Sequence, residues 1–372
     1  MDLYTLDKNF LRTDVVDDFN SVIWTERYTS AGDVTLIVPL TRENILKIPE
    51  GSFLATPASQ EVMLIESALI EKGQLKLTGS TLVKFLNNRV IRATAAPEDR
   101  YLNVNGVPGI LLWALVNNFC MPGTPYTIDS STGIDGPRQV IPNLSLDTYD
   151  TTGAMITMGI SYGPLYDGLV QIAQTSMVGF TLYLASASTS GYSLKFKSYR
   201  GRDLTSGQSL LPIVRFSSAM DSLTEVKELR SIAGYKNVAY AFAPANPGGL
   251  ADSPGVAYTD VNAKNAIGFD RRIIMVFADD ITTDLVGGDK AVLVQLLTQR
   301  AKDALANNNY VKMVDGELVP QSQFQYGRDY GLGDIIELQG PSGLVQNARI
   351  TEYIRAQDST GEREYPTVSV ID

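Results

Sequence analysis

Apolar residues recur at every second position in several stretches of this chain, and this alternation constrains the fold most. Val34, Leu36, Val38 and Leu40 fall on one face of an extended segment, and Tyr192, Leu194 and Phe196 do so in another. Because a strand points successive side chains to opposite faces, this period predicts half-buried β-strands. The expected class is therefore mainly β with a few helices (α+β).

Further strands are predicted where short apolar or alternating runs lie between turn-forming residues. They span residues 61–69, 74–78, 237–242, 335–338, 350–355 and 367–370. The run Ile273-Ile274-Met275-Val276-Phe277 has no polar face. Such a run is typical of a strand that is buried on both faces. The segments 71–73, 188–191 and 358–361 are predicted turns.

Four stretches have the apolar spacing of helices, namely 80–89, 108–120, 164–173 and 289–305. Ser80 or Thr81 is the expected N-cap of the first, and a proline opens the second, as suits a first helical turn. We expect the second helix to be largely buried through Ile110, Leu111, Trp113, Ala114 and Leu115. The fourth is the longest, with Asp289 as its predicted N-cap.

A chain of 372 residues is expected to form two or three domains. Composition places the end of a first β domain, 1–95, near residue 95, and we further expect an accessory region at 96–215 with helices and a long loop and a second β domain at 216–372. The accessory region need not be continuous, and the second β domain includes the helix 289–305. Residues 122–152 and 243–262 are rich in glycine, proline and polar residues, and we expect them to be exposed excursions.

A faint internal similarity links the two ends of the chain. Gly32-Asp33 and Gly333-Asp334 each open a predicted strand, and strands that carry Ile65-Glu66 and Ile350-Thr351-Glu352 follow them. The spacing from glycine to isoleucine is 33 residues in the first copy and 17 in the second. The pattern raises the hypothesis of a duplicated β domain.

Composition removes many functions. The chain has no histidine and one cysteine, Cys120. This excludes Ser-His and Cys-His relays, disulfides within the chain and cysteine-rich metal centres. A net charge of −10 argues against a protein that grips nucleic acid. The N-terminus lacks the pattern of a signal peptide and no long apolar run occurs, so we expect neither classical export nor a membrane anchor.

Three patterns imitate functional motifs. Gly159-Ile160-Ser161-Tyr162-Gly163 matches a nucleophile elbow, but its serine has no imidazole to take the proton. The acids Asp279, Asp280, Asp284 and Asp289 lack the order of an EF-hand loop and read as turn and cap residues. The arginines in 200–203 and 271–272 have no phosphate-binding loop beside them. We therefore predict no catalytic, cofactor-binding or metal-binding residues and no cofactor.

Several segments, taken in order along the chain, carry a resemblance to a known family. They are Trp24-Thr25-Glu26-Arg27-Tyr28, Gly32-Asp33-Val34-Thr35-Leu36 with Val38-Pro39, Met63-Leu64-Ile65-Glu66, Gly79-Ser80 with Leu86 and Arg89-Val90-Ile91, 165–173, Tyr199-Arg200-Gly201-Arg202-Asp203-Leu204-Thr205, Tyr326-Gly327-Arg328-Asp329-Tyr330-Gly331-Leu332-Gly333-Asp334-Ile335-Ile336, and 353–366. Together they resemble the siphophage minor tail proteins that form the baseplate hub at the tail tip, a family common among phages of actinobacteria.

The resemblance implies a tail-hub architecture with two tail-tube-like β domains plus accessory domains. It implies a non-enzymatic structural protein of the virion tail tip, assembled in the host cytoplasm, that forms a homotrimer. Such a hub adapts the sixfold tail tube or distal tail ring to the threefold tip and lines the DNA exit channel. The implied partners are distal tail and tail tube proteins, the tape measure protein and other tail-tip proteins, with DNA only in passage.

Other functions stay open at this point. A distal tail ring protein would be hexameric, and a host-glycan-binding tail module would expose an aromatic platform. A glycosidase needs two carboxylates set close together, and 41 acidic residues do not exclude such a pair. Some hubs carry a fused lysozyme-like or peptidase domain, which we do not expect after the last predicted strand here.

Overall fold

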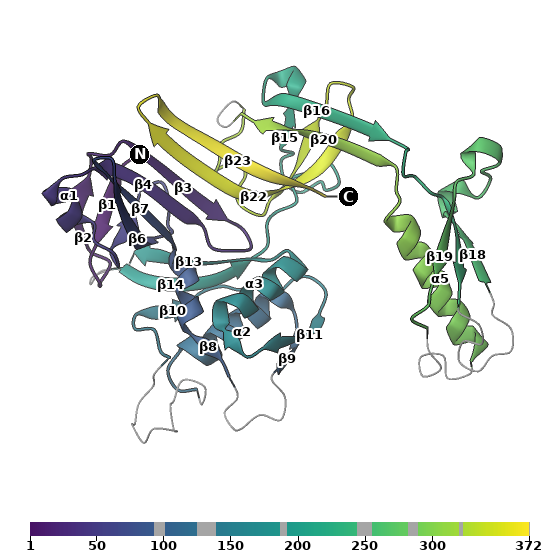
Figure 1. Cartoon of the computed structure of the whole chain (residues 1–372), viewed down its shortest axis with the longest axis horizontal. Helices are drawn as coiled ribbons and strands as arrows, with labels where there is room; N and C mark the ends of the chain where they lie inside the picture. The colour runs from purple at the N-terminus through teal and green to yellow at the C-terminus, as the bar shows by residue number, and fades with distance from the viewer. Residues whose placement is uncertain are drawn as a thin grey trace. The chain divides into compact units, whose positions relative to one another are not determined.

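The computed structural model describes residues 1–92, 101–124, 139–186, 192–243, 255–281, 289–319 and 323–371. The chain forms two compact units, and Figure 1 shows the elements of each. Unit 1 consists of Met1–Val226 and Gly316–Asp372, and unit 2 consists of Lys227–Asp315. Both units contain strands and helices, and strands predominate, so the predicted mainly β class is confirmed.

An 11-stranded sheet forms the frame of unit 1, in the order β15-β21-β22-β3-β4-β7-β6-β5-β1-β2, with β23 paired to β22. Its strands are β1 (Leu3–Leu6), β2 (Arg12–Val16), β3 (Ser21–Arg27), β4 (Asp33–Pro39), β5 (Phe53–Ala55), β6 (Met63–Glu71), β7 (Gln74–Thr81), β15 (Arg215–Ser217), β21 (Ile335–Gln339), β22 (Val345–Asp358) and β23 (Gly361–Ile371). The short helix α1 (Arg42–Lys47) follows β4. Because β22 pairs with β3, strands from both ends of the chain share one sheet.

The alternation in the sequence explains how this sheet is buried. Val34, Leu36 and Val38 of β4 are at most 1% exposed, and Trp24 of β3 lies in the same apolar cluster. Leu40 follows the end of β4 and is 38% exposed, so its predicted place on the buried face was wrong. The hairpin between β6 and β7 turns on Lys72 and Gly73, which both have positive φ angles, as a type I′ turn requires.

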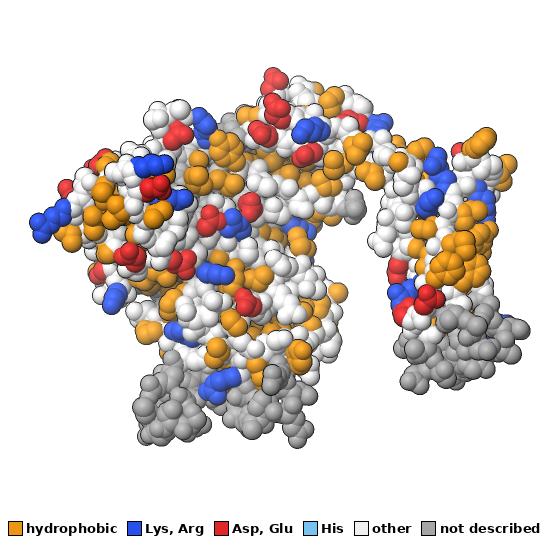
Figure 2. All heavy atoms as spheres, viewed as in Figure 1, with side chains coloured by type: hydrophobic (Ala, Val, Ile, Leu, Met, Phe, Trp, Pro, Cys, Tyr) orange, Lys and Arg blue, Asp and Glu red, His pale blue; other side chains and the backbone are white. Residues whose placement is uncertain are grey.

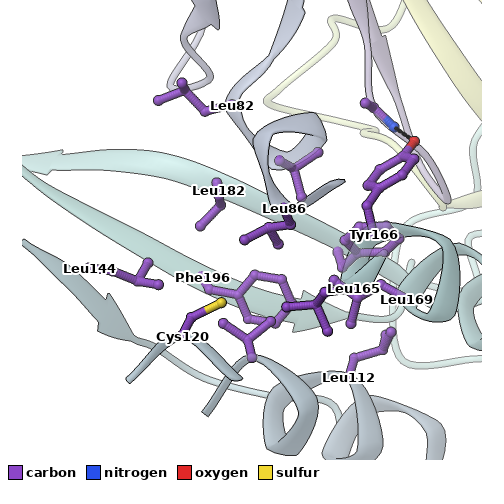
Figure 3. Packing of buried hydrophobic residues seen from close by; sticks show 14 of the residues in the cluster. Leu82, Leu86, Leu112, Cys120, Leu144, Leu165, Tyr166, Leu169, Leu182 and Phe196 are labelled. Atoms are coloured by element: carbon purple, nitrogen blue, oxygen red, sulfur yellow. Dashed lines mark hydrogen bonds between the residues drawn. The ribbon is translucent and has the colours of Figure 1, made fainter. Parts of the chain in front are cut away.

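A second layer of unit 1 holds its helices. It contains the 3-10 helix η1 (Leu82–Asn88), β8 (Val90–Ile91), β9 (Tyr101–Gly106), α2 (Pro108–Cys120), β10 (Leu144–Leu146), β11 (Ile156–Ser161), β12 (Gly163–Pro164), α3 (Leu165–Ser176), β13 (Gly179–Ser186) and β14 (Tyr192–Tyr199), and the 3-10 turn η3 (Ser218–Met220) follows β15. Figure 3 shows the apolar cluster in which η1, α2 and α3 pack on β13 and β14. The Tyr166 hydroxyl accepts a hydrogen bond from the Ala31 amide at 2.8 Å, which ties this layer to the main sheet.

Unit 2 contains a three-stranded sheet with one long helix. Its elements are β17 (Val238–Phe242), β18 (Gly255–Thr259), the 3-10 turns η5 (Val261–Ala263) and η6 (Gly268–Asp270), β19 (Ile273–Phe277) and α5 (Lys290–Ala306). The strand order is β18-β17-β19. Leu293, Leu297 and Ala301 of α5 are fully buried against one face of this sheet. The paired strands β16 (Leu223–Ser231) and β20 (Val311–Leu318) contain the division between the units.

Most predicted strands and helices are present, and the differences have physical causes. Residues 80–89 form the end of β7 and a 3-10 helix in place of an α-helix, and no side chain caps it at Thr81. In α2, Leu112, Leu115 and Val116 are buried, whereas Ile110 is 38% exposed, so the predicted buried face was partly wrong. The other two helices, α3 and α5, agree with the prediction, and Asp289 caps α5 through the Ala291 amide.

Three segments that the composition marked as loops or turns are partly structured or fall outside the described residues. Residues 144–146 form β10, which pairs with β14, and residues 255–259 form β18. Residues 125–138, 244–254 and 188–191 lie outside the described residues. The predicted boundaries at 1–95, 96–215 and 216–372 are a finer division than the two units and stay a prediction.

Among the described helices, none has the length and apolarity to cross a membrane.

Two parts of the main sheet are built alike. The strands β5, β6 and β7 follow one another as an antiparallel meander, and so do β21, β22 and β23. Ile65 of β6 is followed by a bulge opposite β7, and Ile350 of β22 is followed by a bulge opposite β23. In the first residue pair after each bulge, the partner strand contributes a threonine, Thr78 in β7 and Thr367 in β23.

A glycine completes this correspondence. The Gly51 amide donates to the Ile65 carbonyl at 2.8 Å, and the Gly333 amide donates to the Ile350 carbonyl at 2.8 Å. Their φ angles are +86° and +87°, a left-handed conformation that glycine adopts without strain. Gly51 therefore corresponds to Gly333, and the sequence comparison was wrong to pair Gly333 with Gly32. The spacing from glycine to isoleucine is then 14 residues in the first copy and 17 in the second.

Candidate functional site

A polar cavity of about 580 Å³ opens in unit 1 where its layers meet. Its wall includes Glu26 of β3, Glu61 just before β6, Lys197 of β14 and Arg355 of β22. The loop that precedes β21 adds Tyr326. These side chains come from all three predicted segments of the chain, so only the folded unit brings them together.

Ion pairs hold part of this wall. Arg355 donates to Glu26 at 2.7 Å, and both side chains are at least nine-tenths buried. Arg202 donates to Asp334 at 2.6 Å, and Arg200 donates to Asp150 at 3.1 Å. Because each of these cations has a carboxylate partner, their charges are largely compensated.

Glu61 differs from its acidic neighbour. Loss of hydration at its buried position, followed by repulsion from Glu26, raises the pKa of Glu61 to about 8. A hydrogen bond from the Thr181 hydroxyl at 2.5 Å and the charges of Lys197 and Arg355 oppose this rise. These surroundings favour the neutral form of the Glu61 carboxyl, whereas Glu26 faces the Arg355 guanidinium.

Tyr183, Tyr199 and Tyr326 also line the cavity. Burial raises the pKa values of Tyr199 and Tyr326 far above the ordinary value, with the Glu26 and Glu61 carboxyls adding to the effect. Tyr326 stacks on Tyr353 with ring centroids 3.5 Å apart. Lys197 lies over the Tyr183 ring at 4.7 Å. The cavity wall thus contains donors, acceptors and aromatic rings, a composition that suits a polar, hydroxyl-bearing ligand.

The motif residues lie elsewhere. Ser161 ends β11, two residues before Gly163, and its side chain is exposed. Asp280 pairs with Arg300, Asp289 caps α5, and Asp284 lies outside the described residues. Among the described residues no three acidic or cysteine side chains are grouped to hold a metal ion.

The two arginine clusters have different surroundings. Arg200 and Arg202 line the cavity, where their carboxylate partners engage them. Arg271 donates to the Tyr240 hydroxyl at 3.5 Å, and Arg272 donates to the Ile232 carbonyl at 3.2 Å, both in unit 2. Sequence reasoning did not single out Glu26, Glu61 or Arg355 as site residues, because residues so far apart form no spacing pattern.

The sheet of unit 2 exposes a second candidate site. Ile273, Met275 and Phe277 of β19 are 41%, 57% and 64% exposed, so the prediction that this strand is buried on both faces was wrong. Only the face that carries Ile274 and Val276 packs against α5. Figure 2 shows hydrophobic side chains gathered on the surface of this unit. We call the outer side of this sheet, formed by Tyr240, Phe242, Ile273, Met275 and Phe277, the open face.

A family model described as Siphovirus ReqiPepy6 Gp37-like protein matches residues 2–368 of the chain. No curated protein matches it. The matched range includes both the polar cavity and the open face.

Solved structures are similar at low identity. The 43 kDa tail protein of prophage MuSo2 from Shewanella oneidensis has 12% identity, a TM-score of 0.47, and coverage of 99% of this chain and 98% of that one. A tail protein from Neisseria meningitidis MC58 has 13% identity, a TM-score of 0.47, and coverage of 100% and 96%. Prophage tail protein gp18 from Listeria monocytogenes EGD-e has 10% identity, a TM-score of 0.45, and coverage of 99% and 94%.

Proposed function

The chain belongs to the Siphovirus ReqiPepy6 Gp37-like family of siphovirus tail proteins, and on this premise we propose that it is the baseplate hub of a long non-contractile phage tail. As a homotrimeric ring at the tail tip, it adapts the sixfold tail tube or distal tail ring to the threefold tip. It lines the channel through which DNA leaves. Its role is structural, with no catalytic step.

The observation that carries this proposal is the pair of matching meanders in one sheet. The strands β5–β7 and β21–β23 share strand order, bulge position and the left-handed glycine. Three chains with two such parts each present six similar positions, which suits contact with a sixfold ring without breaking closure. A duplicated β part in a threefold ring is the simplest structure that meets both symmetries.

Charge supports a channel-lining role for unit 1. Unit 1 contains 21 basic and 31 acidic residues, whereas unit 2 contains ten of each. The whole net charge of −10 therefore lies in unit 1. An acidic wall repels phosphates, so DNA slides past it without sticking. A lumen that proved to be net basic would contradict this part of the proposal.

Cryo-electron microscopy of the assembled tail, with light scattering of the purified chain, tests the proposal. We expect a threefold ring at the tail tip, between the tail tube or distal ring and the tip proteins. Its neighbours are expected to be distal tail and tail tube proteins, the tape measure protein and other tail-tip proteins. A sixfold ring would instead identify a distal tail ring protein, and absence from the particles would overturn the proposal.

The polar cavity favours a second candidate function, the binding of a host glycan. Its carboxyl, guanidinium and phenol groups suit hydroxyls, and its tyrosine rings suit the apolar face of a sugar. Calorimetric titration of the chain with oligosaccharides from host cell wall tests this function. Binding that Lys197→Met abolishes, and that the exposed control Lys72→Met leaves intact, would support it.

A further inference from the structure

The open face of unit 2 has the composition of a covered surface. The β19 run is apolar on both sides, which is typical of strands with packing on both faces. The register places Met275 beside Tyr240 and Phe277 beside Phe242, with the Phe242 and Phe277 rings 6.3 Å apart. Aromatic, methionine and arginine side chains are the types that protein interfaces favour, and Arg271 binds the Tyr240 hydroxyl at the same face.

The chain carries a second exposed apolar feature, in unit 1. Leu210 is 92% exposed, and Leu211 and Ile213 are 40% and 45% exposed. The Gln208 side chain fixes the backbone here, because its carbonyl oxygen accepts from the Leu210 and Leu211 amides at 2.7 Å each. We call residues 210–213 the apolar loop.

Charge indicates that these two surfaces meet between copies. Each chain carries a net charge of −10, so copies repel one another over most of unit 1. Unit 2 has no net charge, and no charged residue occurs between Asp203 and Arg215 around the apolar loop. Contact between the open face and the apolar loop therefore joins an acidic protein to itself at its least repulsive surfaces.

We propose that the open face of one copy binds the apolar loop of a second copy. The contact joins two different patches, and such a head-to-tail contact generates a closed ring when the rotation between copies closes, as the proposed homotrimer requires. It thus specifies how a ring of this chain closes. The inference rests on the proposed function, since it supplies the interface that the proposed homotrimer needs.

Light scattering of the full chain over a concentration series tests the proposal. Met275→Glu places a charge in the open face and Leu210→Glu places one in the apolar loop, and we expect each to weaken association at least about 30-fold, as loss of a central contact does. Leu69→Glu is the matched control, since Leu69 is 54% exposed on β6 and we expect it to associate like the wild type. Thermal unfolding verifies that all three variants are folded.

A mixture of the two variants gives the sharpest result. The Met275→Glu chain keeps an intact apolar loop, and the Leu210→Glu chain keeps an intact open face. Only one contact can therefore form, between the loop of the first chain and the open face of the second. We expect the mixture to form a dimer of twice 40.5 kDa that does not grow further. A face-to-face contact between two open faces would instead let the Leu210→Glu chain dimerise by itself and leave the Met275→Glu chain monomeric, and this result would overturn the proposal.

Two other outcomes would also overturn it. One is a wild-type chain that stays monomeric up to its highest soluble concentration, as expected if unit 1 of the same chain or another tail protein covers the open face. The other is a Met275→Glu chain that associates like the wild type. If tails that carry Met275→Glu still show a threefold ring, this inference fails while the hub function stands; a wild-type chain absent from tails removes the hub function instead.

Discussion

Strands β4 of unit 1 and β19 of unit 2 are both rich in apolar residues, yet their surroundings differ. In β4 the buried residues Val34, Leu36 and Val38 alternate with half-buried neighbours, and one apolar face is enough to anchor it. In β19 all five residues are apolar, and the helix α5 covers one face only. The apolar face of β4 is thus covered within unit 1, whereas one apolar face of β19 stays exposed in unit 2.

The two units also differ in charge. Unit 1 carries the entire net charge and holds buried ion pairs such as Arg355 with Glu26. Unit 2 is balanced in charge. The difference indicates a division of roles, in which unit 1 forms an acidic body that repels other copies except near its apolar loop, and unit 2 offers an uncharged apolar face for assembly.

The largest expected effect breaks the self-contained character of unit 1. Arg355→Met leaves the Glu26 carboxylate buried without its partner, and we expect a loss of about 3–5 kcal/mol in the free energy of unfolding of unit 1. Chemical denaturation followed by circular dichroism measures it. Arg328→Met is the control, because its pair with Asp329 lies on the surface, where solvent screens the charges, and its loss should change stability little. Equal effects of the two changes would contradict a closed polar core.

The second-largest loss of stability is expected at the covered face of the unit 2 sheet. Leu297→Ala removes a fully buried side chain from α5, and we expect unit 2 to lose about 2–4 kcal/mol while the unfolding of unit 1 is unchanged. Val294→Ala, on the exposed side of the same helix, should change little. Hydrogen exchange, measured separately for the amides of each unit, shows which unit each variant destabilises. Equal loss of protection in unit 1 would show that the units do not fold separately.

A smaller, pH-dependent effect distinguishes the two carboxyls of the cavity. The folded pKa of Glu61 is about 8, above its ordinary value of 4.5, so the native state binds the extra proton between these pH values. The free energy of unfolding is therefore expected to fall as pH rises from 4.5 to about 8. Glu61→Gln should flatten this decline in denaturation curves recorded across that range. An unchanged slope would mean that Glu61 is ionised in the folded chain.

The smallest effect belongs to the open face. Met275→Ser removes an exposed apolar side chain, and we expect the stability of the isolated chain to change by no more than about 0.5 kcal/mol. Thermal unfolding at low concentration, where copies are apart, measures it. A loss above about 2 kcal/mol would show that the face is covered within the chain, and the contrast with β4 would disappear.

The sequence predicted the local elements well because their signals are local. Proline at the start of α2, Asp289 as the cap of α5 and alternation in β4 each act within a few residues. The one misassigned helix, residues 82–88, has helical spacing, but it follows β7 without a side-chain cap and forms a 3-10 helix. The cavity was not predicted, because Glu26, Glu61 and Arg355 are brought together only by the pairing of β22 with β3 and the docking of β13 and β14.

The sequence by itself determined the strand-rich class, the absence of imidazole and disulfide chemistry, and the acidic charge, because these depend on composition and on periods of a few residues. The sequence also contains the internal similarity, but its short patterns paired Gly333 with Gly32 and not with Gly51. Only the tertiary structure decided that Gly51 corresponds to Gly333, since the match lies in a shared bulge and backbone hydrogen bonds. It alone decided which face of β19 is covered, because burial depends on what the rest of the chain packs there.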